Sequence, residues 1–187
     1  MIDSADIAAG VALISVASKS LPASEPTSPA KLRTKELLEQ LAAEYQLLRS
    51  STDPQRNLKL TIVRDRVTSC GRKLDADDII ELINDGDYAK RIFALLIAAD
   101  SSSVRIFVVV LTALEEPDTV YEQHVALVAA CDLVTRLDTK LNSSHLAALR
   151  LVVDRQMKDG ARHQITRAEA DRWLLCQQLL AATKPNP

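Results

Sequence analysis

Glycine and aromatic residues are scarce in this sequence of 187 residues, which holds four glycines, two phenylalanines, three tyrosines and one tryptophan. A fold built from many short strands needs frequent turns, for which glycine is a preferred residue, so this composition disfavours a β-sandwich or a β-barrel. Alanine and leucine are abundant, and hydrophobic residues make up 47% of the chain. The sequence therefore predicts a folded, mainly helical protein with an aliphatic core.

The sequence motifs of several enzyme classes are also missing. The four glycines are spread singly, so neither the phosphate-binding loop GxxxxGKS/T nor the dinucleotide-binding GxGxxG can be formed. HExxH and GxSxG are absent, and no CxxC pair is available to hold structural zinc. We predict no catalytic residue, no metal site and no cofactor, and leave open only a small helical enzyme whose site is built from scattered side chains.

The three cysteines, Cys70, Cys131 and Cys176, all lie in helical patterns. Buried free thiols are the simplest interpretation of such positions, and they are typical of a reducing, cytoplasmic compartment. Arg72 and Lys73 follow Cys70 and could stabilise a thiolate. We nevertheless favour an unreactive thiol at a helix end.

The segment YEQH could suggest catalysis or metal binding, because it contains Glu122 and His124. Two positions apart on a helix, these side chains would point about 200° away from each other and could not bind one metal ion together. A half-buried structural histidine is therefore the expectation for His124.

No hydrophobic run is long enough to cross a bilayer, and we expect no membrane contact. The apolar segment 5–19 has no basic residues before it, as a signal peptide would. Instead, Asp3 precedes it and Asp6 lies within it. The next eleven residues, 20–30, include three prolines and three serines, a composition typical of a linker. We predict a short tethered N-terminal helix with its linker in residues 1–30 and an all-helical domain in residues 31–187. The tethered helix would pack on the domain or on another chain, including a second copy.

From Thr34 onward, apolar residues recur at steps of three and four, the pattern of amphipathic helices. The segment 104–116, VRIFVVVLTALEE, is rich in valine and could form a strand by propensity, but a single strand would have no partner, so we predict a helix. The result is an all-α fold with about eight packed helices. Predicted helix starts are Asp53, Asp75, Asp118 or Thr119, Asn142 and a capping box at Thr166–Glu169; predicted ends are Gly71, Gly86, Leu137, Gly160 and Leu180.

Two stretches of the domain are similar at a fixed spacing. Residues 82–99 and 114–130 align with an offset of 32, which places Phe93 on Val125, and an acidic turn, NDGD or EEPD, divides each copy. Such a period is typical of helical-hairpin solenoids, because a single hairpin cannot bury its apolar face alone. The stretch DDIIELINDGDYAKRIFALLIAA resembles a HEAT-type repeat, which implies stacked helical hairpins.

A second resemblance rests on LAAEYQLLRSSTDPQRNLKLTIVRDRV and the later YEQHVALVAA. Together they resemble a helical accessory module of multidomain bacterial proteins, which stands beside a separate signalling or defence effector domain. The resemblance covers residues 34–182 and implies regulation or scaffolding without a reaction. The residues that carry it are Glu44, Tyr45, Arg49, Pro54, Arg56 and the four residues Tyr121, Glu122, Gln123 and His124.

Charge is unevenly distributed along the chain, although the net charge is only −2. Residues 31–73 hold ten Lys/Arg and five Asp/Glu, whereas residues 74–139 hold four and thirteen. The turns of stacked hairpins line one edge, so we predict that the acidic residues of these turns form an acidic rim. Such a rim would attract a basic peptide or domain. Helix capping is an alternative explanation for the same acidic residues. The acidic rim consists of Asp85, Asp87, Glu115, Glu116 and Asp118.

Arg56, Lys59 and Arg66 lie near a common face of one predicted helix and form a basic stripe that could follow nucleic-acid phosphates. No aromatic residue is interleaved with the stripe, and the acidic centre would repel a long duplex. The sequence therefore predicts, first, a non-catalytic adaptor or regulatory module that binds another protein. The alternative is a nucleic-acid-associated regulator that uses the stripe.

Overall fold

The computed structural model describes residues 28–158 and 161–183. These residues contain eight α-helices and no strand, which confirms the predicted all-α fold. The predicted helix at 5–19 lies outside the described residues. The helices are α2 (Pro29–Ser50), α3 (Arg56–Gly71), α4 (Ala76–Ile83), α5 (Tyr88–Ala98), α6 (Val104–Glu115), α7 (Val120–Leu137), α8 (Ser143–Gln156) and α9 (Ala170–Ala182), with a 3-10 turn, η2 (Asp138–Lys140), after α7.

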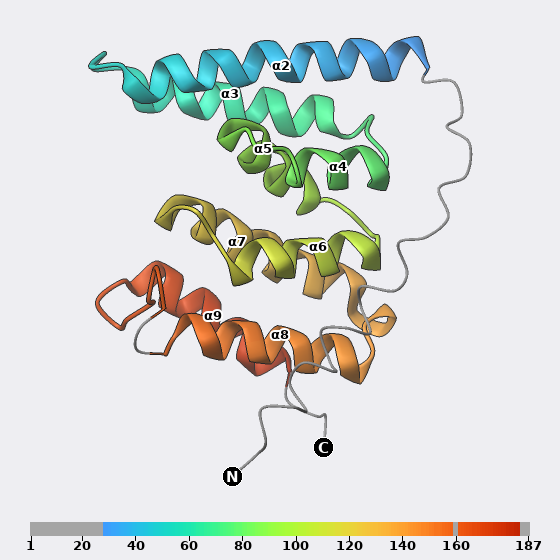
Figure 1. Cartoon of the computed structure of the whole chain (residues 1–187), viewed down its shortest axis with the longest axis vertical. Coiled ribbons are helices and arrows are strands. Elements are labelled where there is room, and N and C mark those ends of the chain that lie inside the picture. The colour runs from blue at the N-terminus through green and yellow to red at the C-terminus, as the bar shows by residue number, and fades with distance from the viewer. Residues whose placement is uncertain (1–27, 159–160, 184–187) are drawn as a thin grey trace.

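The helices pair into four hairpins, α2–α3, α4–α5, α6–α7 and α8–α9, which are stacked in chain order (Figure 1). The first helices α4, α6 and α8 contact one another in sequence, and so do the second helices α3, α5, α7 and α9. The similar stretches 82–99 and 114–130 occupy equivalent places in the two middle hairpins. Each begins at the end of a first helix, crosses the turn and continues into the second helix.

A continuous aliphatic core runs through the stack, and its largest buried side chains include Phe93 and Phe107. Helix α6 shows why the valine-rich segment is not a strand. Ile106, Val110 and Leu114 are each at most 1% exposed. They recur at steps of four residues, close to the repeat of an α-helix. No helix among the described residues is both long and apolar enough to cross a membrane.

Three predicted caps are confirmed. Asp75 accepts from the backbone N–H of Asp78 at 3.0 Å, Thr119 caps α7, and Asn142 caps α8. Each side-chain oxygen satisfies a backbone N–H that has no partner within the first turn of its helix.

Three predicted helix starts are wrong by a few residues. Helix α2 begins at Pro29, inside the predicted linker, because Ser28 caps it and proline suits a first helical position. Helix α3 begins at Arg56, since Asp53 uses its carboxylate to accept from the backbone N–H of Gln55 in the preceding turn. Helix α9 begins at Ala170: the predicted capping box at Thr166–Glu169 closes a separate turn instead.

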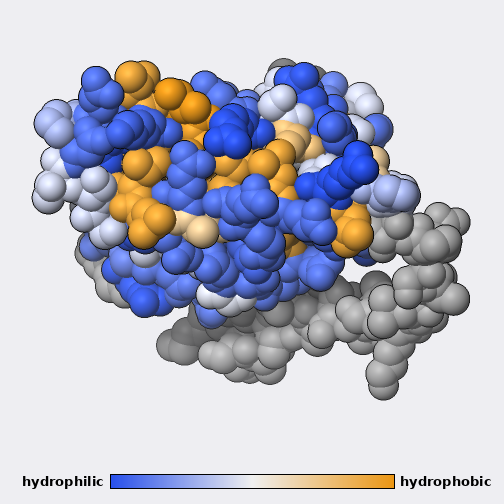
Figure 2. Space-filling view, turned by 90° about the horizontal axis from the view of Figure 1, so that it is seen from above, coloured by the Kyte–Doolittle hydropathy of each residue, from blue (hydrophilic) through white to orange (hydrophobic). Residues whose placement is uncertain are grey.

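The first hairpin forms one end of the described stack, and its outer side carries exposed apolar residues. Leu47 is 74% exposed, Leu58 60% and Ile62 49%. We call these three residues the outer face. Figure 2 looks onto this end and shows apolar residues gathered across its middle, with hydrophilic residues between and around them. Inside the stack, each hairpin is covered by the next, whereas no hairpin of the described chain covers this one.

Candidate interaction surface

The two acidic turns are neighbours on one edge of the stack. The Tyr88 hydroxyl, at the start of α5, lies 3.2 Å from Oγ1 of Thr119, which caps α7. Arg91 of α5 also pairs with Asp118 at 2.9 Å. The structure therefore brings the five residues of the acidic rim to the edge where the turns of the two middle hairpins lie (Figure 1).

Most of the acidic rim is already engaged within the molecule. Asp87 caps α5 by accepting from the backbone N–H groups of Ala89 at 2.8 Å and Lys90 at 3.0 Å. Asp85 accepts from the backbone N–H of Asp87 at 2.8 Å, and this bond lowers the pKa of Asp85. The ammonium of Lys90 lies 3.2 Å from Asp85 and partly neutralises this turn.

The other rim carboxylates, apart from one, also have cationic partners. Asp118 pairs with Arg91, and Glu115 pairs with Arg155. Glu116 is exposed, and within the described residues its side chain makes no hydrogen bond or ion pair. Bases thus alternate with the acids along this edge, so the rim does not present the uninterrupted negative surface that a basic peptide would need.

The basic stripe lies exposed on α3, as its helical spacing predicts. Two of its three cations are paired: Lys59 with Asp53, and Arg66 with Glu44 at 3.2 Å. Arg56 alone has no carboxylate partner among the described residues. The stripe therefore has less unpaired positive charge than its sequence suggests.

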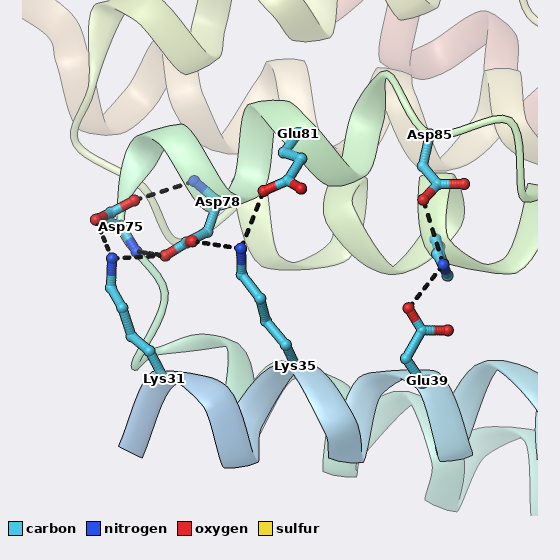
Figure 3. A network of polar contacts seen from close by, with 8 residues as sticks. Lys31, Lys35, Glu39, Asp75, Asp78, Glu81 and Asp85 are labelled. Atoms are coloured by element: carbon cyan, nitrogen blue, oxygen red, sulfur yellow. Dashed lines mark hydrogen bonds and ion pairs between the residues drawn. The ribbon is translucent and has the colours of Figure 1, made fainter. Parts of the chain in front are cut away.

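The basic residues of the first hairpin pair with the acidic residues of the second (Figure 3). Lys31 of α2 pairs with Asp75 and, at 2.9 Å, with Asp78. Lys35, one turn further along, lies 3.0 Å from Asp78 and 2.9 Å from Glu81. The hydrogen bond from Lys31 lowers the pKa of Asp75 to about 2. The basic first hairpin and the acidic second one thus attract each other.

A second bridge extends this network along α2. The Lys90 ammonium lies between Glu39, at 2.7 Å, and Asp85, at 3.2 Å. Figure 3 shows both bridges side by side between α2 and the second hairpin. Sequence reasoning missed these bridges, because each joins α2 to a residue more than forty positions away and only the stacking of the hairpins brings them together.

The carboxylate of YEQH is structural. Glu122 is fully buried, accepts from the backbone N–H of Asp118 at 3.0 Å and pairs with Arg91 at 2.5 Å. His124, the other residue of interest, is half-buried. No group of three or more His, Cys, Asp or Glu side chains in the part of the chain that the structure describes is arranged to hold a metal ion.

The residue between them, Gln123, organises a second buried polar network. Its amide donates to Oε1 of Gln156 at 2.7 Å and to the carbonyl of His163 at 2.9 Å, and its oxygen accepts from Arg172. Gln123 is completely buried, and Arg172 is 6% exposed. These bonds fasten α7 to α8, to α9 and to the loop between them, and the sequence offered no periodic signal for them.

The thiols show no sign of activation. Burial raises the pKa of Cys131 to about 11 and that of Cys176 to about 12. Burial also raises the pKa of Cys70, and the nearby Lys73 and Arg66 offset this only in part. The interpretation of Cys70 as an unreactive helix-end thiol therefore agrees with its surroundings.

A cavity of about 360 Å³ opens between α3, α4, α5 and α6, on the edge opposite the acidic turns. Its polar lining consists of Thr68, Arg72, Asp100 and the serines 101–103, with Ile79, Ile97 and Ile106 among its apolar residues. Asp100 is paired with Arg136. The lining contains no histidine and no cysteine, and its one carboxylate, Asp100, is the one held by this ion pair.

Comparison with protein-family models, with curated proteins and with solved structures finds no match to this chain. The functional argument therefore rests on the surface itself. Eight large hydrophobic residues are exposed in the described chain: three of them form the outer face, and a fourth, Leu32, also lies on α2. The other four are spread over α7, α8 and α9.

Proposed function

We propose that this chain is a non-catalytic protein-interaction module that docks a partner on the outer face of its first hairpin. The observation that carries the proposal is the exposure of Leu47, Leu58 and Ile62 at an end of the stack that no described hairpin covers. Burying a side chain of this kind contributes about 1.5–3 kcal/mol, so three of them provide a substantial part of a specific interface.

The partner that fits this face is an α-helix or helical hairpin with a stripe of leucine, isoleucine or valine. Within the stack, α4 packs on α6 and α6 on α8, so a further hairpin on the outer face would repeat an arrangement that the fold already uses. Arg56 has no carboxylate of its own in the described chain, which favours a partner with acidic residues beside its apolar stripe.

An adaptor or regulatory role is part of this proposal. The four stacked hairpins support the HEAT-like resemblance, because scaffold proteins of that type consist of such units. The setting in a bacterial signalling or defence system rests on the sequence resemblance alone and is proposed on that basis.

The test compares partner capture by the wild-type chain, by a Leu58→Glu/Ile62→Glu variant and by a Leu174→Glu variant. Leu174 is 64% exposed on α9 and provides a matched control for an added charge on an exposed leucine. We expect a partner that the wild type and the control retain and the double variant loses, with all three chains equally helical. Affinity is then measured by calorimetry with the purified partner.

Three other results would contradict the proposal. Equal capture by all three chains would exclude the outer face as the docking site. A marked loss of stability in the double variant would mean that the chain itself, for example its segment 5–19, covers the face. The nucleic-acid alternative would be supported if nuclease treatment removed the captured material and if the triple variant Arg56→Gln/Lys59→Gln/Arg66→Gln failed to capture it.

A further inference from the structure

All three tyrosines of the chain, Tyr45, Tyr88 and Tyr121, gather with two arginines where the first three hairpins meet. The guanidinium carbon of Arg49 lies 4.2 Å from the centre of the Tyr88 ring. Arg64 donates to the Tyr121 hydroxyl at 3.2 Å. Tyr45 stands one turn before Arg49 on α2, and both arginines influence the pKa of its hydroxyl. The five side chains therefore share one neighbourhood, which we call the Tyr–Arg cluster.

Neither arginine of the Tyr–Arg cluster has a carboxylate partner among the described residues. Arg64 is half-buried, and its guanidinium donates only to neutral oxygens, the Tyr121 hydroxyl and the carbonyl of Leu60 at 3.4 Å. A guanidinium has five N–H donors, so several donors on each arginine stay available. Elsewhere in the described chain, a half-buried cation such as Lys90 or Arg91 is paired with acids.

The Tyr45 hydroxyl is a further unused donor. Its residue is only 4% exposed, and its ring is fixed by an edge contact with Phe93 at 5.5 Å. In the described part of the chain, the hydroxyl has no hydrogen-bond partner. Among the described residues, Arg91 Nε is the one fully buried side-chain nitrogen or oxygen that lacks a partner, so the unpartnered Tyr45 oxygen is not completely enclosed. Burial raises the pKa of Tyr45, so the hydroxyl keeps its proton at neutral pH.

We propose that the Tyr–Arg cluster binds an oxyanion, a phosphate or a carboxylate group, through Arg49, Arg64 and the Tyr45 hydroxyl. Two guanidinium groups without acids provide the charge, and their planar donors match the oxygens of such a group. The hydroxyl adds a directed donor in a partly desolvated place, where each hydrogen bond is stronger than in water.

The site is independent of the outer face, because the two sets of residues do not overlap. An oxyanion bound here would connect α2 and α3 with the rings that α5 and α7 contribute, so it would also stabilise the stack. This link gives a readout that does not depend on any partner protein.

The test titrates the full chain with inorganic phosphate and, separately, with acetate at constant ionic strength, observed by NMR at the arginine Nε–H and tyrosine ring signals. We expect saturable shifts at Arg64 and Tyr45. Stronger binding of phosphate would assign a phosphate group, and stronger binding of acetate a carboxylate. The melting temperature should rise with the anion that binds.

Tyr45→Phe is the sharpest variant, because it removes one oxygen that no described group uses and should keep the fold. Anion affinity should fall about tenfold, as expected when a hydrogen bond to a charged group is lost. Arg64→Gln should abolish saturation, whereas Arg33→Gln, which removes an exposed arginine of α2 that has no ion pair among the described residues, should bind like the wild type. Absence of saturable shifts in the wild type, or equal affinity in the Tyr45→Phe and wild-type chains, would overturn the proposal.

Discussion

Arg91 at the start of α5 and Glu122 at the start of α7 form an ion pair across two hairpins, with 2.5 Å between guanidinium nitrogen and carboxylate oxygen. The Glu122 side chain is fully buried, and its second oxygen accepts from the backbone N–H of Asp118 at 3.0 Å. The pair therefore fixes the turn before α7 against α5 of the preceding hairpin. A buried charge of this kind is stabilising only while its partner is present.

Glu122→Ala should lower the free energy of unfolding by about 3 kcal/mol or more, because it leaves the Arg91 guanidinium without its buried acid. Urea denaturation followed by circular dichroism measures this change. Glu116→Ala is the matched control: Glu116 lies six residues earlier, is exposed and makes no ion pair in the described chain, so its replacement should change stability by less than about 0.5 kcal/mol. Equal effects of the two changes would show that the Arg91 pair contributes nothing particular.

Gly71 should not tolerate alanine, because α3 ends where Ile97 of α5 crosses it. A Cβ at Gly71 would lie 2.3 Å from Cγ1 of Ile97 and 2.8 Å from its Cγ2, far inside contact distance. We expect Gly71→Ala to cost about 1–3 kcal/mol through overpacking. Gly86→Ala provides the control, since nothing lies within 4 Å of the added carbon. If the two variants melt at the same temperature, the close approach of Gly71 and Ile97 is wrong.

The ion pair of Lys31 and Asp75 should make the free energy of unfolding depend on pH under acidic conditions. The hydrogen bond from Lys31 lowers the pKa of Asp75 from 3.8 to about 2 in the folded protein. A carboxyl with a lowered pKa stabilises the fold above its unfolded pKa, and this contribution disappears as the pH falls from 3.8 toward about 2. Lys31→Gln should therefore lose less stability than the wild type over this interval.

Urea midpoints at neutral pH and at about pH 3 measure this dependence. Arg33→Gln, on the same helix, removes an exposed cation that has no ion pair in the described chain, and it should keep the acid dependence of the wild type. Because the pair is exposed, added salt should weaken its effect. A Lys31→Gln chain with the full acid dependence would show that other carboxylates are responsible.

The sequence was sufficient for the helices because their signals are local. Steps of three and four between apolar residues predicted most of the helices, and the lack of a partner strand predicted α6 in spite of its valines. Asp75, Thr119 and Asn142 marked three starts correctly. The errors at α2 and α3 arose where a proline or an aspartate stands among several polar residues, and the sequence alone does not show which of them caps the helix.

The candidate sites depended on contacts between distant segments. The acidic rim was predicted from turn positions, but its neutralisation by bases such as Arg155, forty residues from Glu115, was not visible in the sequence. The Tyr–Arg cluster was hidden for the same reason: Tyr121 lies 57 residues from Arg64, and no local period connects them.

By itself, the sequence determined that this protein is all-α and where most of its helices lie. Helix hydrogen bonds and caps join residues four or fewer positions apart, so their pattern is written along the chain. Only the tertiary structure decided which charges are neutralised, as with Lys31 and Asp75, and which are left for a ligand, as with Arg64. The reason is geometric: stacking of whole hairpins sets which side chains meet, and that depends on every helix packed between them.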